Sequence, residues 1–257
     1  MVVRFGIMST VPTRLPLSSP AFDLEAVGYV DRWDRSPIVR FWRSRVISRV
    51  VCGTEAGGRI ADLGMGIGTD AFCLEAAGFH VVGLDGSPGM VAAARERGLT
   101  ARLGDLRDAP ALLGRDFDSV LCNFGVMNCL ESLGCIQEVL TTILRPGGRA
   151  FLVWMTPHCP VEAIARLVRL QRPRRGRATA NVAGVSVPLR WWSSGEVKKA
   201  LKPSFCTLSV EAIGLFDPPP DLGGRPGWRT RMEPRFAAVP GLRALGVHTL
   251  LVAERRA

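Results

Sequence analysis

The chain has 257 residues, of which 47% are hydrophobic, and its formal net charge is +10. The hydrophobic content excludes a disordered protein, and the length favours one domain with insertions over two domains. No apolar run approaches the roughly 20 residues that a membrane-spanning helix needs. The positive charge reflects either an arginine-rich coding bias or a nucleic acid, an anionic membrane or an acidic substrate as partner.

The N-terminal residues and the cysteines further restrict the class of protein. Residues 1–20 hold a short apolar patch without the apolar core of a signal peptide, so we expect a disordered arm and a cytoplasmic protein. The seven cysteines are scattered without a C-x-x-C pair, which argues against a disulfide framework and a zinc site. We therefore expect reduced thiols and no bound metal. Residues 21–257 should form one domain, with a lid at 21–52 and substrate-side insertions at about 158–195 and 214–245.

The first predicted helix lies in the lid. Pro37 is suited to a first helical turn, and apolar residues then recur at helical spacing (Ile38, Phe41, Trp42, Val46, Ile47 and Val50). Tyr29 and Trp33 precede this helix. The segment is either a hydrophobic lid packed on the core or a lid that closes over a ligand.

Residues 59–72 are the most informative stretch. A short apolar run contains Asp62, three glycines follow at alternate positions (Gly64, Gly66 and Gly68), and a helical pattern comes next. Glycine permits both the sharp turn and the close approach of a ligand to the backbone. The free N–H groups at the start of the helix then face that ligand. The stretch predicts a nucleotide-type site.

Strands and helices alternate through the rest of the chain. Strands are predicted at 80–85, 100–105, 117–124 and 149–155, with helices at 88–98 and 130–144 and a turn at 145–148. A helix at 195–201, a strand at 207–213, an irregular excursion at 214–236 and a last strand at 246–254 follow. The fold class is α/β: a Rossmann-like, seven-stranded, mostly parallel sheet with helices on both faces and a C-terminal antiparallel hairpin.

Polar residues close three of the predicted strands. Asp85, Asp105 and Asn123 should therefore project from the sheet edge that carries the glycine turn. A dinucleotide site needs G-x-G-x-x-G, but Thr69 stands where its third glycine would be. A carboxylate at Asp62 would repel a pyrophosphate and would suit a cationic amino group.

Five segments, taken in order, resemble the successive motifs of class I S-adenosylmethionine-dependent methyltransferases. They are ADLGMGIGTD, VVGLDGSPGMVAAARERG, LGDLRD, FDSVLCNFGVMNCL and LRPGGRAFLVWM. YVDRW, TPHCPVEAI and VPLRWWSSGEVKKAL are similar to segments of small-molecule methyltransferases of bacterial biosynthetic pathways. The resemblance implies S-adenosyl-L-methionine as methyl donor, S-adenosyl-L-homocysteine as product and a small-molecule acceptor.

The resemblance also implies roles for single residues. Asp62 and the glycines Gly64, Gly66 and Gly68 would hold the methionine portion, and Asp85 would bind both ribose hydroxyls. Contacts with the rest of the adenosine would come from Gly86, Ser87, Asp105 and Leu106, and Asn123 and Phe124 would line the methyl-transfer channel. Met65 and Ile67 depart from the smaller residues usual between the glycines. Acceptor-pocket candidates are Tyr29, Trp33, Asn128, His158, Trp191 and Trp192.

The acceptor side leaves alternatives open. His158 follows the fifth predicted strand and either deprotonates a hydroxyl or caps the next helix, whereas His80 and His248 are interpreted as structural. Phe216 and Trp228 join Trp191 and Trp192 in either walling an apolar pocket or plugging the sheet end.

Arginine is concentrated in one later segment. Residues 163–195 contain seven arginines and no acid, which predicts a solvated surface, a dock for an anionic substrate or a carrier protein, or an RNA-binding site. Asn123 is not followed by the two prolines of adenine-N6 methyltransferases, and Cys122 is not preceded by proline as in the cytosine-C5 type. A nucleic-acid acceptor is therefore disfavoured. The alternatives to small-molecule methyl transfer are a non-catalytic S-adenosylmethionine-binding protein and an RNA methyltransferase.

Overall fold

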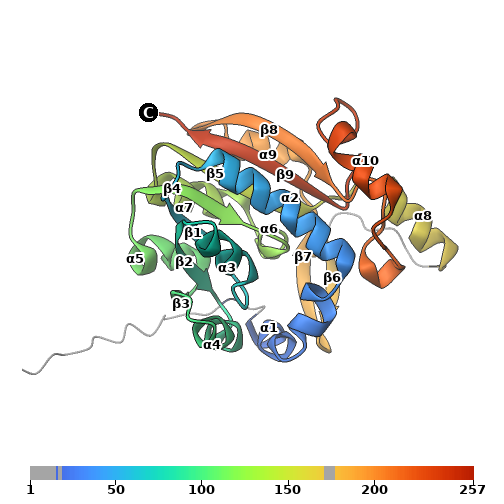
Figure 1. Cartoon of the computed structure of the whole chain (residues 1–257), viewed down its shortest axis with the longest axis horizontal. Coiled ribbons are helices and arrows are strands. Elements are labelled where there is room, and N and C mark those ends of the chain that lie inside the picture. The colour runs from blue at the N-terminus through green and yellow to red at the C-terminus, as the bar shows by residue number, and fades with distance from the viewer. Residues whose placement is uncertain (1–15, 17–18, 171–176) are drawn as a thin grey trace, which may run out of the picture.

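A seven-stranded sheet forms the centre of the molecule (Figure 1). The computed structural model describes residue 16 and residues 19–170 and 177–257. The strand order is β3-β2-β1-β4-β5-β9-β8; the first five strands are parallel, and β9 runs antiparallel to both β5 and β8. The predicted fold class is confirmed. The strands are β1 Arg59–Leu63, β2 His80–Asp85, β3 Ala101–Leu103, β4 Phe117–Cys122, β5 Leu144–Met155, β8 Phe205–Ile213 and β9 His248–Arg255.

Helices cover both faces of the sheet. The longer ones are α1 Ser19–Ala26, α2 Pro37–Gly53, α3 Thr69–Ala76, α4 Pro88–Glu96, α7 Leu133–Ile143, α8 Pro160–Val168, α9 Ser194–Leu201 and α10 Trp228–Phe236. The shorter helical segments are the π-helix η1 Val30–Asp34, η2 Leu106–Asp108, α5 Ala109–Leu113, α6 Val126–Cys129 and η3 Pro220–Leu222. The starts of α2 at Pro37 and of α4 at Pro88 are as predicted, and the Ser87 hydroxyl accepts a hydrogen bond from the Met90 N–H.

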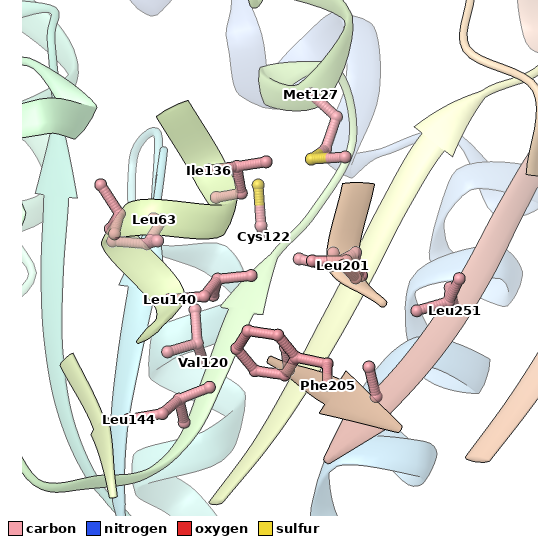
Figure 2. Close-up of a cluster of buried hydrophobic side chains, with 14 of the residues drawn as sticks. Leu63, Val120, Cys122, Met127, Ile136, Leu140, Leu144, Leu201, Phe205 and Leu251 are labelled. Carbon is pink, nitrogen blue, oxygen red and sulfur yellow. The ribbon is translucent and has the colours of Figure 1, made fainter. Parts of the chain in front are cut away.

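Each face of the sheet has its own hydrophobic core. Alternate strand residues face α5, α7 and α9 on one side and α2, α3 and α4 on the other, as the two-residue period of a strand requires. In β5, for example, Leu152 and Trp154 belong to the first core, and Phe151 and Val153 belong to the second. Figure 2 shows the first core around Leu140, which is fully buried.

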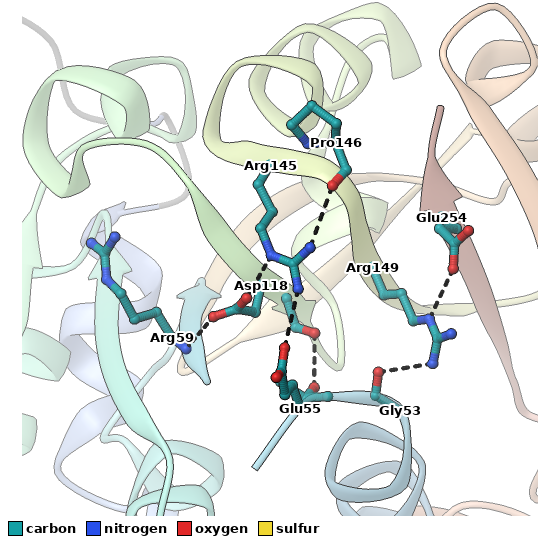
Figure 3. A network of polar contacts seen from close by, with 10 residues as sticks. Gly53, Glu55, Arg59, Asp118, Arg145, Pro146, Arg149 and Glu254 are labelled. Carbon is teal, nitrogen blue, oxygen red and sulfur yellow. Dashed lines mark hydrogen bonds and ion pairs between the residues drawn. The ribbon is translucent and has the colours of Figure 1, made fainter. Parts of the chain in front are cut away.

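The amino-terminal edge of the sheet is held by ion pairs (Figure 3). The Asp118 carboxylate accepts hydrogen bonds from the Arg59 N–H (2.8 Å) and from Arg145 Nε (2.6 Å). Burial opposes its charge, but these donors hold the pKa of Asp118 below its usual value. Beside it, Arg149 Nε lies 3.2 Å from Glu254. This edge, away from the glycine turn, is electrostatically satisfied.

The structure corrects three local predictions. The predicted helix at 130–144 is α7, which begins only at Leu133, where the Ser132 hydroxyl accepts a hydrogen bond from the Gly134 N–H. The predicted turn at 145–148 belongs to β5, because Leu144 already pairs with Phe117 of β4. The insertion after β5 contains a hairpin that the sequence pattern did not indicate, β6 Arg177–Val182 and β7 Val185–Arg190.

The excursion at 214–236 is not irregular throughout, because it contains α10. The fully buried Glu233 of α10 accepts hydrogen bonds from the N–H groups of Gly214 (3.0 Å) and Leu215 (2.8 Å), and it pairs with Arg45. Pro234 within the helix and a largely polar composition concealed the helical pattern. A tertiary anchor, rather than an amphipathic stripe, fixes this helix.

The expected arm at residues 1–20 lies almost entirely outside the described residues. None of the helices that the structure does describe has both the length and the apolar character needed to cross a bilayer.

We expect Leu140→Ala to lower the free energy of unfolding by about 2–5 kcal/mol, because it removes a buried side chain and leaves a cavity. Leu208→Ala is the matched control: Leu208 is 48% exposed, and its change should stay within about 0.5 kcal/mol. Urea unfolding followed by circular dichroism measures both. Equal losses in the two variants would contradict this placement of the core.

Candidate functional site

The predicted glycine turn joins β1 to α3. Gly64, Gly66 and Gly68 all have positive φ angles (74°, 57° and 80°), a conformation that side chains with a Cβ rarely adopt. A Cβ at Gly64 would also lie 2.0 Å from Val126 Cγ2, so the close packing of this turn on α6 requires glycine. Glycine at this position therefore lets Val126 pack directly against the turn.

Asp85 stands at the end of β2 and faces the turn. Its carboxylate accepts hydrogen bonds from the Gly66 N–H (2.8 Å) and the Ser87 N–H (2.9 Å). Burial raises the pKa of Asp85, and the two N–H donors oppose that rise. The acid thus connects the glycine turn to the start of α4 and leaves further lone pairs for a ligand's hydroxyl groups.

A cavity of about 1320 Å³ lies at this edge of the sheet. Eight of the eleven predicted cofactor-binding residues line it: Gly64, Gly66, Asp85, Gly86, Ser87, Asp105, Leu106 and Phe124. Among the predicted acceptor-side residues, Tyr29, Trp33 and Trp191 line it as well. A smaller hollow of about 330 Å³ lies at the opposite edge, around Asp118 and Arg145.

Three predicted cofactor residues lie behind the cavity wall. Asp62 is only 1% exposed; Gly68 packs against Leu99; and Asn123 Nδ2 donates to Asp70 Oδ2 (2.8 Å). They support the residues that line the cavity.

Several predicted acceptor-pocket residues also lie away from the cavity. Asn128 Nδ2 donates to the carbonyls of Met155 and Arg190, and Trp192 Nε1 donates to the Met127 carbonyl, so both side chains lie in the core. His158 is exposed and Trp228 is 75% exposed, and neither lines the cavity.

A buried charge network forms part of the wall, and the sequence analysis missed it. Arg43 of α2 pairs with Asp70 of α3 (Nη1 to Oδ1, 2.7 Å) and lies 3.6 Å from Asp34. Burial opposes the charge of Arg43, yet Asp70 and its other acidic neighbours raise the pKa of the guanidinium. The signal was available, because Arg43 occupies the buried stripe of α2 between Val39 and Val46.

Asp62 is a buried acid of this region whose charge is only partly compensated. Its Oδ2 atom is buried and accepts no hydrogen bond from any residue in the described part of the chain. Burial and the negative charge of Asp70 raise the pKa of Asp62 well above its usual 3.8, although Arg43 opposes the rise. A buried acid kept in this state indicates a site for a cationic group.

The backbone after β4 is strained at the cavity. Phe124 has a φ of 37°, unusual for a residue with a side chain, and its N–H donates to Asn123 Oδ1 (3.1 Å). The Phe124 ring lies 4.8 Å from the His248 ring and 5.5 Å from the guanidinium carbon of Arg43. Strain of this kind is characteristic of functional sites.

His248 begins β9, within the predicted last strand. It was interpreted as structural, but it lines the cavity between Phe124 and Trp42, at 8% exposure. Because β9 is antiparallel to β5, its first residue lies at the edge where the parallel strands end. Of the three histidines, this is the one that borders the cavity.

Two segments outside the sheet close the cavity. Glu25 of α1 is 3% exposed and accepts a hydrogen bond from Trp33 Nε1 (2.7 Å), which fixes the lid. The β6–β7 hairpin contributes Leu189 and, just after it, Trp191, which pack with Ala21 of α1. The lid therefore both packs on the core and covers the cavity.

The arginine-rich segment is only partly described. Arg166 lines the cavity and pairs with Glu162, and Arg190 stacks 3.9 Å from the Trp192 ring. Arg172, Arg174 and Arg175 lie outside the described residues, as does the side chain of Arg177. No group of three or more His, Cys, Asp or Glu side chains within the described ranges is arranged to hold a metal ion.

Comparison with known proteins finds a family match to the central part of the chain. Residues 60–148, which run from β1 into β5, match the family model described as a methyltransferase domain. This part of the chain is similar to a methyltransferase domain. The match contains the glycine turn, Asp85, Asp105 and Phe124, so the methyltransferase domain supplies most of the cavity's sheet-edge residues.

The chain is also similar in sequence to two curated proteins. The demethylmenaquinone methyltransferase of Mycobacterium sp. (strain KMS) is 33% identical over 145 residues, which are 55% of this chain and 61% of that protein. The corresponding protein of Clavibacter sepedonicus is 37% identical over 126 residues, 46% of this chain and 49% of that one. The similarity thus spans about half to three fifths of the length of these curated relatives.

Solved structures show the same fold over nearly the whole chain. A methyltransferase of Thermotoga maritima, described as a possible histamine N-methyltransferase, superposes with a TM-score of 0.63 at 18% identity, covering 91% of this chain and 99% of that one. The CcbJ methyltransferase of Streptomyces caelestis gives a TM-score of 0.62 at 18% identity, covering 93% and 99%. At this identity the likeness is one of fold.

We expect Asp62→Asn to raise the free energy of unfolding at neutral pH. Because the folded-state pKa is raised above 3.8, the stability contributed by Asp62 is complete below that pH and is lost as pH rises through the folded pKa. Asparagine cannot ionise, so the advantage of the variant should grow with pH. Urea unfolding of both proteins at several pH values between about 4 and 8 measures this difference in stability.

Asp118→Asn is the control, and its expected effect on the free energy of unfolding is opposite. The pKa of Asp118 is lowered, so its stabilising contribution is present above the unfolded-state value of 3.8 and is lost as pH falls. This variant should be less stable than the wild type at neutral pH. Destabilisation of similar size in both variants at neutral pH would show that Asp62 is satisfied in the fold.

Proposed function

We propose that the protein transfers a methyl group from S-adenosylmethionine to a small-molecule acceptor. The observation that carries the proposal is the arrangement at one end of the cavity: the glycine turn, Asp85 facing it, and behind it Asp62, whose Oδ2 accepts no hydrogen bond from the described residues. A nucleoside with a cationic amino acid tail satisfies all three. The methyltransferase domain match at residues 60–148 supports the same donor.

The residues present fit S-adenosylmethionine. Asp85 would accept hydrogen bonds from the ribose hydroxyls, and Asp105 with the Leu106 backbone would hold the adenine. Asp105 already accepts from Arg107 Nε (2.8 Å), which fixes its carboxylate at the cavity wall. Asp62 and Asp70, beside the glycine turn, would favour the positively charged methionine portion.

S-adenosylmethionine, when bound, supplies a methyl group already activated by its sulfonium. The protein therefore has to orient an acceptor in line with that group and exclude water. Phe124 and Trp42 provide an apolar wall, and the lid with the β6–β7 hairpin closes the other side. His248, between the two aromatic rings, is placed to receive the acceptor's proton at a ring nitrogen.

The cavity wall points to a largely apolar acceptor. Val182, Leu189 and Trp191 from the hairpin side and Phe22 and Trp33 from the lid border it. The relatives named for demethylmenaquinone support a small organic acceptor. Arg32 and Arg166 also border the cavity, and each is paired with a glutamate, Glu25 and Glu162 respectively.

Asp85→Asn should weaken S-adenosylmethionine binding by about 10- to 100-fold, the loss expected when a charge-assisted hydrogen bond becomes a neutral one. Isothermal titration calorimetry on the purified chain measures this. Asp118→Asn makes the same chemical change at the opposite edge and should keep wild-type affinity. Equal affinity in wild type and Asp85→Asn would overturn the proposed site.

Incubation with S-adenosylmethionine and a bacterial cell extract should yield S-adenosylhomocysteine, detected by mass spectrometry. His248→Gln should lower the yield and flatten its rise with pH, whereas His158→Gln, on the surface, should not. Ribonuclease treatment should leave the yield unchanged; its loss would point to RNA as acceptor. Binding without any product would identify a non-catalytic binder.

A further inference from the structure

Helix α8 presents an unpartnered apolar face to solvent. Ile164, Leu167, Val168 and Leu170 are 62%, 71%, 78% and 95% exposed. Residues 164, 167 and 168 follow the i, i+3, i+4 spacing of one helical face, and Leu170 comes just after the helix. We call these four side chains the α8 face. In Figure 1, α8 lies at the margin of the molecule, away from the sheet.

The opposite side of α8 attaches the helix to the protein. Glu162 is 4% exposed and pairs with Arg166, and Val161 packs against a hydrophobic core. Arg169 Nη1 donates to the Asp221 carbonyl (2.7 Å). The helix is therefore fixed by its polar and inner residues, and its most apolar residues are left outside.

Single exposed apolar residues are common on protein surfaces, but four within seven positions form a contiguous patch that indicates a partner. The local charge restricts that partner. In the sequence, residues 163–177 contain six arginines and no acid, in a chain whose net charge is +10; Arg166 and Arg169 are described and make contacts within the protein, and the side chains of the other four lie outside the described residues. A second copy of the chain would bring a like charge to the same place, so electrostatics opposes self-association there.

An anionic lipid surface satisfies both properties of this region. The acyl boundary accepts leucine and isoleucine side chains, and the headgroup phosphates attract arginine. We propose that the α8 face docks the protein on an anionic membrane surface, with the helix lying in the plane of the interface. Such docking needs no membrane-spanning segment.

The position of α8 gives the docking a consequence for the cavity. Arg166, on the inner side of the helix, lines the cavity, and so do Pro220 and Asp221 of η3, against which α8 packs. A docked α8 face therefore brings the cavity rim to the lipid surface. If the proposed methyl transfer holds, an apolar acceptor dissolved in the membrane can reach the cavity along this helix.

Cosedimentation of the full chain with vesicles tests the docking. Vesicles of phosphatidylcholine with about 30% phosphatidylglycerol should sediment the protein at low salt, and pure phosphatidylcholine vesicles should not. Binding should weaken as salt screens the arginines. The double variant Leu167→Glu/Leu170→Glu should bind at least about tenfold more weakly, because it removes two apolar contacts and adds two like charges to the anionic surface.

Leu208→Glu is the matched control. It makes the same chemical change at a half-exposed leucine of edge strand β8 and should bind the vesicles like the wild type. Unchanged circular dichroism and unchanged S-adenosylmethionine titration in the double variant separate a docking defect from misfolding and from failure of the proposed function.

Three outcomes would overturn the proposal. The wild type does not sediment with anionic vesicles; or the double variant sediments as well as the wild type; or light scattering without lipid shows an oligomer that the double variant dissociates. The last outcome would assign the α8 face to self-association.

Discussion

The buried ion pair between Arg43 and Asp70 is the interaction on which the site depends. It joins α2, the long helix of the lid, to α3, which begins at the glycine turn. Asn123, at the end of β4, donates to the other oxygen of the same carboxylate. Three elements far apart in the sequence are thereby held at one wall of the cavity. Removing one partner of such a pair typically costs about 3–5 kcal/mol, because the other charge remains buried. The wall is therefore rigid before any ligand binds.

The acids at the two edges of the sheet differ in how their charges are compensated. At the amino-terminal edge, Asp118 is paired and its pKa is lowered, so its charge contributes to stability. At the carboxyl-terminal edge, Asp62 is buried without a hydrogen-bond partner at Oδ2 among the described residues, and its pKa is raised. A fold selected for stability alone would have no reason to keep that acid ionisable. The unfavourable burial is explained if a cationic ligand group compensates for it, as at many sites where stability is exchanged for function.

Local patterns predicted the part of the molecule in which neighbouring residues determine structure. The glycine turn, the Ser87–Pro88 helix start and Asp85 at a strand end each follow from a few adjacent residues. Arg43 was missed because its partner lies 27 positions away in sequence, although its place in an apolar helical stripe was a visible signal. His248 was interpreted as structural, although the predicted antiparallel last strand already implied that its first residue lies at the cavity edge of the sheet. α10 was missed because a buried carboxylate, not hydrophobic periodicity, holds it.

The insertion after β5 lies outside residues 60–148, the part that matches a methyltransferase domain, and forms another side of the cavity. The β6–β7 hairpin packs on α1 through a small cluster around Ala21, Val187, Leu189 and Trp191, distinct from the two cores of the sheet. A segment held by so few buried contacts opens at lower free energy than the sheet does. The β6–β7 hairpin and α1 can therefore separate to admit an acceptor, while α2, Asp85 and the glycine turn stay in place. Helix α8 belongs to the same insertion as the hairpin. A membrane surface that binds α8 therefore also restrains the wall of the cavity that the β6–β7 hairpin forms.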